Sequence, residues 1–477
     1  MNLKGIFYFL GNLLLIIGCS MIFPIIVSLI YSERDFFVFV FSMIITLITA
    51  LILKKFKNDK KRYTYKDGFI AVFLSWVIAS IFGAIPFWLS GVFDTPLDAF
   101  FESVSGFTTT GATIISSLEY MSYSLLFWRS FIHWLGGMGI IAMVIIIIPE
   151  LSGNIYLYKR ESTGPFNSRI KPRIKETSLF LWYIYLFLTI VEVLLLNHFG
   201  MPFFDSLIHS FGTISTGGFS LSPLSIKIYN NINLEIIVII FMYLSGINFS
   251  LYYQGFKKGL KNFFVNDELK LYTYIILIFT FAITIDINSN IYSNIFLSFR
   301  NALFQVISII TTTGYATINF DIWPSFSRWL LLILMFIGGC AGSTAGGIKI
   351  VRIIILFKAV KQELKKLLYP GIVEKIKINN HIISDNLIKN VMIFFFMYIS
   401  IMAVVIILLT ATGLDLISAL SATASTLGNV GPGLKLIGPL NSFAVLTPFA
   451  RSLLIICMLL GRLEIYTVFV FIFIEWR

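Results

Sequence analysis

Four short segments of the 477-residue chain share a pattern that suits ion binding rather than acid–base chemistry. They align without gaps as DAFFESVSGFTTTG (98–111), DSLIHSFGTISTGG (205–218), NALFQVISIITTTG (301–314) and DLISALSATASTLG (415–428). Every block opens with Asp or Asn, carries threonine two residues before its end and closes on glycine. Fourfold agreement at three positions predicts a unit of about 100 residues that occurs four times.

Each block indicates a half-helix followed by extended backbone. The opening residue is a suitable helix N-cap, at Asp98, Asp205, Asn301 and Asp415. About ten helical residues, roughly 15 Å, then reach the bilayer centre without crossing it. Non-helical backbone at that depth is tolerated only where it lines a cavity. Four such strands around one axis would present rings of carbonyls that replace the water shell of a cation. The alternative is four structural Gly/Thr turns.

A second segment without large side chains is GGCAGSTAGG at 338–347. Glycine at this density disfavours helix by up to about 1 kcal/mol per residue relative to alanine, so we expect the helix to be broken there. Small residues for close helix packing are the alternative. A phosphate-binding loop is excluded because Ile348, not lysine, follows Gly347.

Four arginines lie in or beside apolar stretches. Arg462 sits mid-span with Glu464 two residues on, and an intramembrane charge is a functional hypothesis by default. A cation there would oppose the passage of another cation; the alternative is a structural ion pair with a neighbouring helix. The others each precede a glycine by ten residues, and we expect them to snorkel at outer helix ends: Arg129, Arg328 and Arg451.

The remaining polar residues carry no catalytic pattern. Glu102 and His209 could support the repeated blocks, whereas His133 and His198 are expected to be structural. No nucleophile–base motif is present, and no set of His, Cys and carboxylates has metal-ligand spacing. The sequence therefore predicts a protein that is not an enzyme. A membrane-embedded transferase using the basic loops is the alternative of another class.

The composition defines the setting in which these segments must be placed. Apolar types make up 57% of the chain and charged types 13%, with a mean hydropathy of +0.89. Soluble domains have about 25% charged residues, so a soluble enzyme and a disordered chain are both excluded. The net charge of +12 fits basic cytoplasmic loops of an integral membrane protein and not a nucleic-acid partner.

Ten apolar stretches are long enough to cross a bilayer. They are 6–30, 36–53, 68–90, 124–149, 178–199, 233–254, 271–289, 328–357, 390–411 and 446–473. The first could be a signal peptide, but it continues past Cys19 and indicates a retained helix. Basic segments fall on every second connection, which predicts cytoplasmic N- and C-termini; these segments are 54–66, 159–175, 257–270 and 349–389.

The chain resembles the Trk/Ktr/HKT superfamily of potassium transporters, and most of all its Trk-type membrane subunit. The resemblance rests on the four blocks, the N-terminal helix pair, TLGNVGPG (426–433) and WRSFIHWLGGMG (128–139). It implies an all-α polytopic membrane protein with four helix–pore-loop–helix repeats around a pseudo-fourfold pore, plus two extra N-terminal helices. The implied division is 1–67 for the helix pair and basic loop, then pore repeats 68–175, 176–265, 266–385 (with a gating loop) and 386–477.

The resemblance also implies which residues do the work. The selectivity filter, through its backbone carbonyls, would be Thr109-Thr110-Gly111-Ala112, Thr216-Gly217-Gly218-Phe219, Thr312-Thr313-Gly314-Tyr315 and Thr426-Leu427-Gly428-Asn429. The gate would comprise Gly338, Gly339, Gly342, Ser343, Thr344, Gly346, Gly347, Lys349 and Arg462. Lys349 and Arg352 couple this segment to a cytosolic partner or act as positive-inside anchors. Sodium-selective plant relatives have serine at the first filter glycine, so Gly111 favours potassium. Only one glycine per block is shared by all four, and some leakage of other monovalent ions is expected.

The implied function is K⁺ uptake through the plasma membrane of a bacterium or archaeon. K⁺ is the transported ion, and no organic cofactor is expected in this chain. The implied partners are a second copy in a homodimer with one pore per protomer, cytosolic nucleotide-binding regulatory subunits of the Trk system, and membrane lipid. A Na⁺-permeating or K⁺/cation symporting member of the same superfamily is the alternative within transport.

Overall fold

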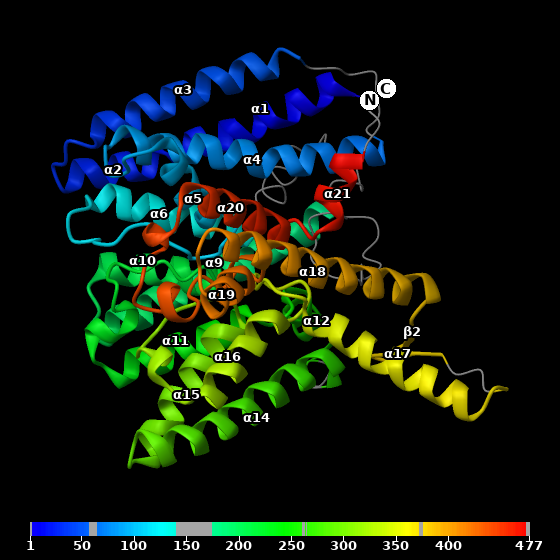
Figure 1. Ribbon diagram of the computed structural model, residues 1–477. Helices are drawn as coiled ribbons and strands as arrows, with labels where there is room; N and C mark the ends of the chain where they lie inside the picture. Colours follow the sequence, from blue (N-terminus) through cyan, green and yellow to red (C-terminus); the bar gives the residue numbers. More distant parts are fainter. Residues whose placement is uncertain are drawn as a thin grey trace.

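The computed structural model describes residues 2–56, 64–139, 174–259, 263, 265–371 and 375–473. Most of the basic segments 54–66 and 159–175, and the end of the predicted span 124–149, lie outside these residues. Helices and loops make up the described part, and its only strands form one hairpin, β1 (Lys377–Ile378) and β2 (His381–Ile382). Figure 1 shows the long helices running side by side, with α1, α3 and α4 at one edge and α14 and α15 at the opposite edge.

Six described helices are long and apolar enough to cross a membrane. They are α1 (Leu3–Ser20) continued by α2 (Ile22–Ile30), α3 (Phe36–Lys54), α4 (Tyr65–Leu89), α9 (Ile174–His198), α14 (Asp267–Asn290) and α18 (Asp385–Ala411). The extra N-terminal helices pack closely, since an added Cβ on Gly11 of α1 would lie 2.8 Å from the Ala50 carbonyl of α3. The predicted polytopic, all-α class is confirmed.

Four shorter helices match the repeated blocks. These re-entrant helices are α5 (Pro96–Phe107), α10 (Phe203–Ile214), α15 (Ile295–Ile310) and α19 (Leu416–Leu427). They are 12, 12, 16 and 12 residues long and largely buried. Each is therefore too short to span, as the sequence predicts.

The predicted N-cap is right for only one of the four helices. Asp415 caps α19 by accepting the backbone N–H of Ser418 at 3.3 Å, and hydrogen bonds from the Ser418 and Lys435 side chains lower the pKa of this carboxyl. The other helices begin earlier, with Thr95, Pro202 and Asn294 at the cap position. In α5 and α15 the start is set upstream, by Thr95 followed by proline at the first helical position and by Asn294, whereas Pro202 makes no side-chain cap bond at the start of α10.

The second helix of each repeat ends beside a re-entrant helix or loop. These helices are α6 (Tyr123–Gly137), α11 (Ile232–Ser245), α16 (Ser325–Ile337) and α20 (Pro448–Arg462). A Cβ added to Gly136 or Gly461 would overlap with the last carbonyls of α5 and α19, at Phe107 and Leu427. Small residues here let the helix ends pack directly against the re-entrant helices.

Two predicted continuous spans are wrong. The stretch 233–254 bends by 87° between α11 and α12 (Phe249–Lys258), because Gly246 ends the first helix and Asn248 caps the second. The stretch 446–473 breaks between α20 and α21 (Tyr466–Phe473), with Glu464 in the left-handed region at φ 52°. The predicted break in 328–357 is confirmed, between α16 and α17 (Ile350–Leu368).

Two hydrophobic clusters form the core. One joins the N-terminal helices with the first and fourth repeats, and the other joins the second and third repeats. Both contain residues of the re-entrant helices, such as Ala422 in the first and Ala424 in the second. Among the re-entrant helices, α10 and α19 contribute to both clusters, whereas α5 packs in the first and α15 in the second.

Candidate functional site

The loops that follow the four re-entrant helices share one backbone conformation. A non-glycine residue with positive φ comes first in each, at Thr109 (55°), Thr216 (55°), Thr312 (58°) and Asn429 (54°). Two residues later comes a glycine with positive φ, at Gly111 (80°), Gly218 (78°), Gly314 (79°) and Gly431 (102°). A β-branched residue in the left-handed region is a genuine outlier, so three of these loops store strain that the surrounding structure must hold.

The fourth loop corrects the gapless alignment by three residues. Thr426 and Leu427 belong to α19 and Gly428 is its C-cap, so the loop proper is Asn429-Val430-Gly431. The gapless alignment pairs Thr426 with Thr109. Thr426 is still part of the helix, and its hydroxyl donates to the Ala422 carbonyl at 2.7 Å. Asn429 takes the place of threonine because asparagine tolerates the left-handed region. The sequence signal for this register was an Asn followed two residues later by Gly.

The four loops close into a ring. A Cβ added to Gly431 would lie 2.7 Å from the carbonyl oxygen of Thr110 in the first loop. At each of the other three glycines an added Cβ would overlap with a carbonyl oxygen of the next loop. These pairs are Gly111 with Gly217, Gly218 with Thr313, and Gly314 with Val430. The order first, second, third, fourth and back to first defines a cyclic arrangement around one axis.

The loop N–H groups point back to the re-entrant helices. Thr110 N donates to Ser105 O at 2.9 Å and Gly217 N to Gly212 O at 2.8 Å. Thr313 N and Val430 N do the same with Ser308 O at 2.9 Å and Ser425 O at 2.8 Å. By contrast, no donor in the described part of the chain bonds to the carbonyl oxygens of these four loop residues. The ring therefore offers neutral oxygen acceptors and not N–H donors.

A buried ion pair supports the first two loops. Arg129 Nε lies 2.6 Å from Glu102 Oε1, and both side chains are at most 3% exposed. The same carboxylate accepts from the Thr113 hydroxyl at 2.9 Å and from Ile114 N at 3.0 Å. Arg129 also donates to Ser220 O at 3.0 Å, with its guanidinium 3.5 Å from the centre of the Phe219 ring. The snorkelling prediction is therefore wrong for Arg129.

Arg451 also departs from snorkelling. Its guanidinium lies 2.5 Å from the Asp98 carboxylate of α5 and donates to Ala444 O at 2.6 Å. Only Arg328 is near the expected situation, since its side chain is 28% exposed and 3.8 Å from Asp321. The ten-residue spacing to glycine thus does not define one common role.

Aromatic and imidazole rings pack behind the second and third loops. The His133 ring stacks on Phe219 at 3.9 Å, and an added Cβ on Gly217 would overlap with that imidazole. The Tyr315 hydroxyl donates to His209 O at 3.0 Å and contacts Phe219 O at 3.3 Å. His133 thus directly contacts the ring of loops, whereas His198 lies exposed near the end of α9.

The glycine-rich loop, Gly338–Lys349, lies against the ring of loops. The Thr344 hydroxyl donates to Ile214 O at the end of α10, at 3.2 Å. Gly346 N donates to the Thr312 hydroxyl at 2.7 Å, and a Cβ on Gly346 would overlap with Gly428 O. Lys349, at φ 78°, donates through Nζ to Ala345 O. This loop is therefore in contact with the second, third and fourth repeats at once.

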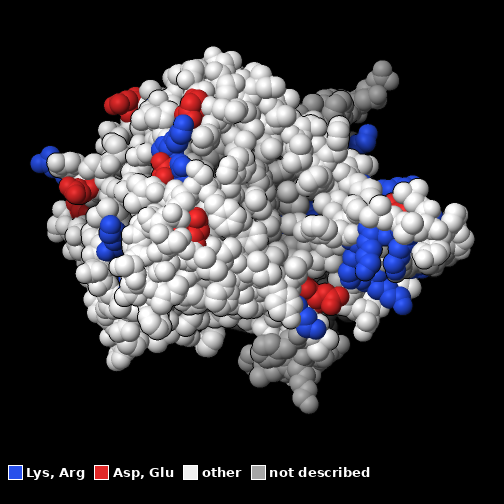
Figure 2. Space-filling model, turned by 60° about the horizontal axis from the view of Figure 1, so that its bottom comes forward, with Lys and Arg blue, Asp and Glu red and all other residues white. Residues whose placement is uncertain are grey.

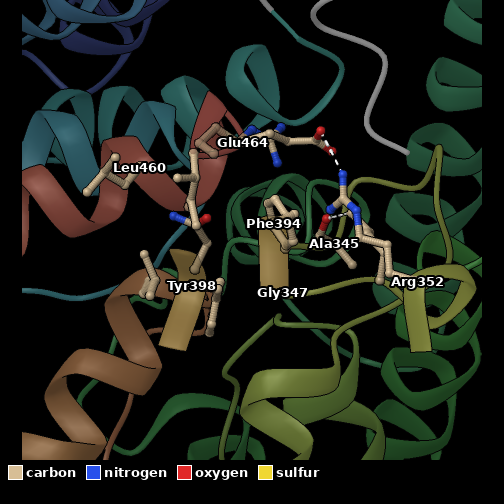
Figure 3. A pocket seen from close by; sticks show the side chains of 14 residues that line it. Ala345, Gly347, Arg352, Phe394, Tyr398, Leu460 and Glu464 are labelled. Atoms are coloured by element: carbon tan, nitrogen blue, oxygen red, sulfur yellow. Dashed lines mark hydrogen bonds and ion pairs between the residues drawn. The ribbon is translucent and has the colours of Figure 1, made fainter. Parts of the chain in front are cut away.

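Arg462 joins the glycine-rich loop to the first repeat. Its guanidinium donates to Thr344 O at 2.9 Å and to Gly136 O and Gly137 O at 2.6 and 3.1 Å. Glu464 instead pairs with Arg352 of α17 at 2.8 Å. A pocket opens beside these groups, and Figure 3 shows Arg352 and Glu464 meeting across it above Phe394 and Tyr398.

Charged side chains gather at the ends of the molecule. Figure 2 shows a broad white surface in the middle and a dense group of basic side chains at the end where α17 projects in Figure 1. An uncharged belt between charged ends is what a bilayer requires. Among the described residues no group of three His, Cys, Asp or Glu could hold a metal ion.

Re-entrant helices, a ring of carbonyl oxygens and an apolar belt together define a polytopic membrane protein of the ion-transporter class. A family profile described as TrkH, a cation transport protein, matches residues 35–476. The chain therefore belongs to the TrkH family of cation transport proteins, which are transporters and not enzymes.

Similar proteins support the same assignment. The Trk system potassium uptake protein TrkH of Salmonella typhimurium is 37% identical, with 98% of each chain covered. An uncharacterised cation transporter of Methanocaldococcus jannaschii is 34% identical, covering 98% of this chain and 95% of the relative. The crystal structure of the potassium transporter TrkH from Vibrio parahaemolyticus aligns over 100% of both chains, with a TM-score of 0.90 and 35% identity.

Proposed function

We propose that this protein takes up K⁺ across the plasma membrane and that the ring of four loops is its selectivity filter. The observation that carries the proposal is the cyclic contact of the four loops, with carbonyl oxygens that no described donor occupies. Such oxygens replace the hydration shell of a monovalent cation without trapping it by charge. The filter segments are then those at Thr109–Ala112, Thr216–Phe219, Thr312–Tyr315 and, in the revised register, Asn429–Pro432.

The related TrkH proteins are named for potassium uptake, and glycine at position 111 is consistent with K⁺ as the preferred ion. Each loop has two positions with positive φ. The second is glycine in all four loops, whereas the first is threonine in three loops and asparagine in the fourth. We therefore expect K⁺ selectivity with measurable leakage of other monovalent cations. A Na⁺-permeating or cation-symporting activity is the competing function.

Uptake by a K⁺-uptake-deficient bacterium that expresses the full chain tests this function. We expect growth at low K⁺ and K⁺ uptake that exceeds Na⁺ uptake at equal concentrations. Reconstitution into proteoliposomes, with K⁺, Na⁺ and H⁺ gradients imposed one at a time, separates channel-like flow from coupled transport. Equal rates for Na⁺ and K⁺ would favour the competing function.

The glycine-rich loop and Arg462 form the proposed gate. Through Thr344 and Gly346 the loop contacts the second, third and fourth repeats. Arg462 fixes Thr344 to the end of α6. A positive charge at the filter side of the pocket also repels a permeating cation. Both effects favour a closed path until the loop and the arginine move.

Replacing Arg462 by alanine is expected to raise K⁺ flux in proteoliposomes by about ten-fold. Hydrogen bonds to a charged group contribute roughly 1.5–3 kcal/mol each, and this change removes those that hold the closed arrangement. The variant Arg462→Lys is the matched control, because it keeps the charge but cannot bond three carbonyls as a planar fork does. A flux from Arg462→Ala equal to that of the native protein would exclude the gate role.

The location and partners belong to the same proposal. The start of α1, α21 and the basic end of α17 lie on one side in Figure 1, which fits cytoplasmic termini in a bacterial or archaeal plasma membrane. The projecting part of α17 also exposes apolar side chains, namely Phe357, Val360, Leu364, Leu367 and Leu368. Exposed apolar and basic residues together suit contact with a second protomer, cytosolic nucleotide-binding subunits and lipid headgroups.

A further inference from the structure

A small hairpin is attached to the core next to the start of α14. Its strands pair antiparallel, Lys377 with Ile382 and Ile378 with His381. Asn379 and Asn380 form the turn, both with positive φ, at 47° and 63°. On the inner side, the hairpin and its flanks bury Ile376, Ile378 and Ile383 in the core of the second and third repeats. The hairpin is therefore a firmly packed unit and not a loose connection.

Asp267, the first residue of α14, binds the hairpin turn in both directions. Its backbone N donates to Asn379 Oδ1 at 2.7 Å, and its carboxylate accepts from Asn379 N at 2.9 Å. Lys358 of α17 adds a bond from Nζ to Lys377 O at 2.7 Å. The hairpin is thereby bonded directly to the first turn of α14 and to α17.

Glu268, the next residue, binds the glycine-rich loop. Its side chain is buried, and a single oxygen, Oε1, accepts from Ala341 N at 2.6 Å and from Val351 N at 3.3 Å. Ala341 lies within the loop and Val351 in the first turn of α17. Lys349, the N-cap residue of α17, makes no side-chain cap bond, so the carboxylate of Glu268 satisfies a helix N-terminal N–H that lacks a local partner.

Glu268 thus holds the glycine-rich loop on both sides, at Ala341 and Val351, and the residues between them are held by other parts of the protein. Thr344 and Gly346 contact the re-entrant helices and the third filter loop, whereas Ala341 is held by α14. We propose that Glu268 is the positioning residue that keeps this loop in its closed place, and that Asp267 couples the loop to the hairpin. The part that concerns gating rests on the proposed function. The physical link itself is a contiguous chain of hydrogen bonds.

The position of the loop is measurable without ion flux, because Cys340 lies in the loop and is fully buried. In a Cys19→Ser, Cys457→Ala background, a water-soluble methanethiosulfonate reports how often the loop leaves its site. We expect Glu268→Ala to speed the modification of Cys340 by about ten-fold or more, since local opening becomes easier when the anchoring bonds are lost. Glu268→Gln should stay within about two-fold of the native rate, because its amide oxygen accepts from the same two N–H groups.

A pair of turn variants tests the link to the hairpin. Asn379→Gly removes the side chain that bonds to Asp267, and glycine accepts the positive φ of this position. Asn380→Gly makes the same change one residue later, where no described hydrogen bond of the side chain is lost. We expect faster Cys340 modification and higher K⁺ flux from Asn379→Gly in liposomes, and native behaviour from Asn380→Gly.

Two outcomes would overturn the proposal: identical Cys340 rates in Glu268→Ala and Glu268→Gln, or identical rates in the two turn variants. A different outcome concerns the gate alone. If Cys340 is modified faster but K⁺ flux stays at the native level, the positioning role holds, and the assignment of the glycine-rich loop as the gate fails.

Discussion

Replacing Gly314 by alanine is expected to abolish K⁺ uptake while leaving the protein folded in the membrane. The added Cβ would overlap with the Val430 carbonyl of the neighbouring loop and lie 2.7 Å from Pro432 Cδ. The positive φ of 79° adds a backbone cost of about 1–2 kcal/mol for an L-residue. Either the fourth loop moves outward or its carbonyl turns away, and both changes break the ring. We expect at least a hundred-fold loss of K⁺ uptake, because a filter needs its oxygens at fixed distances.

Gly91→Ala is the matched control, because it adds the backbone strain of a positive φ without the steric overlap of the added Cβ. Gly91 has nearly the same conformation, with φ 73°, but an added Cβ would meet nothing within 4 Å. This control should lose about 1 kcal/mol of stability and keep native K⁺ uptake. Uptake is followed in the K⁺-uptake-deficient strain, with membrane amounts compared by immunoblot. Normal K⁺ uptake by Gly314→Ala at native membrane levels would rule out the ring of loops as the filter.

The repeat itself was predictable from sequence because its signals are local. Half-helices of about ten residues, a glycine after each, and the break within 338–347 all follow from the composition of short windows. The register of the fourth loop was missed, because asparagine stands there where the other three loops have a strained threonine, and the match of Asn429 to Thr109 was made from the backbone. A letter-by-letter match selects Thr426 instead.

The contacts that support the loops could not be predicted from the sequence for a different reason. The partner of Arg129 lies 27 residues away, on another helix, and nothing in the local sequence distinguishes it from Arg328. The bend after α11 depends on Gly246 next to a neighbouring tyrosine and a cap at Asn248. Such tertiary contacts decide burial, and burial decides whether an arginine is an anchor at the interface or a structural partner.

Arg129→Met is expected to destabilise the protein by about 3–5 kcal/mol, the usual cost of leaving one partner of a buried ion pair alone. The Glu102 carboxylate would keep only Thr113 and Ile114 as partners. The second loop would also lose the bond to Ser220 O and the stacking on Phe219. Because the first two loops of the proposed filter depend on this residue, K⁺ selectivity over Na⁺ should fall along with the unfolding temperature.

Arg328→Met is the matched control, since this arginine occupies the corresponding helix of the third repeat but is partly exposed and 3.8 Å from its acid. Exposed pairs contribute about 0–1 kcal/mol, so its unfolding temperature in detergent and its K⁺/Na⁺ flux ratio should remain native. The double variant Glu102→Gln/Arg129→Met removes the uncompensated charge while keeping an acceptor for Thr113 and Ile114, and should recover part of the stability. If the two single variants unfold at the same temperature and select K⁺ equally well, the ion pair does not hold the filter. A recovery of stability without recovery of selectivity would instead show that the contacts to Ser220 and Phe219, which the double variant still lacks, set the position of the second loop.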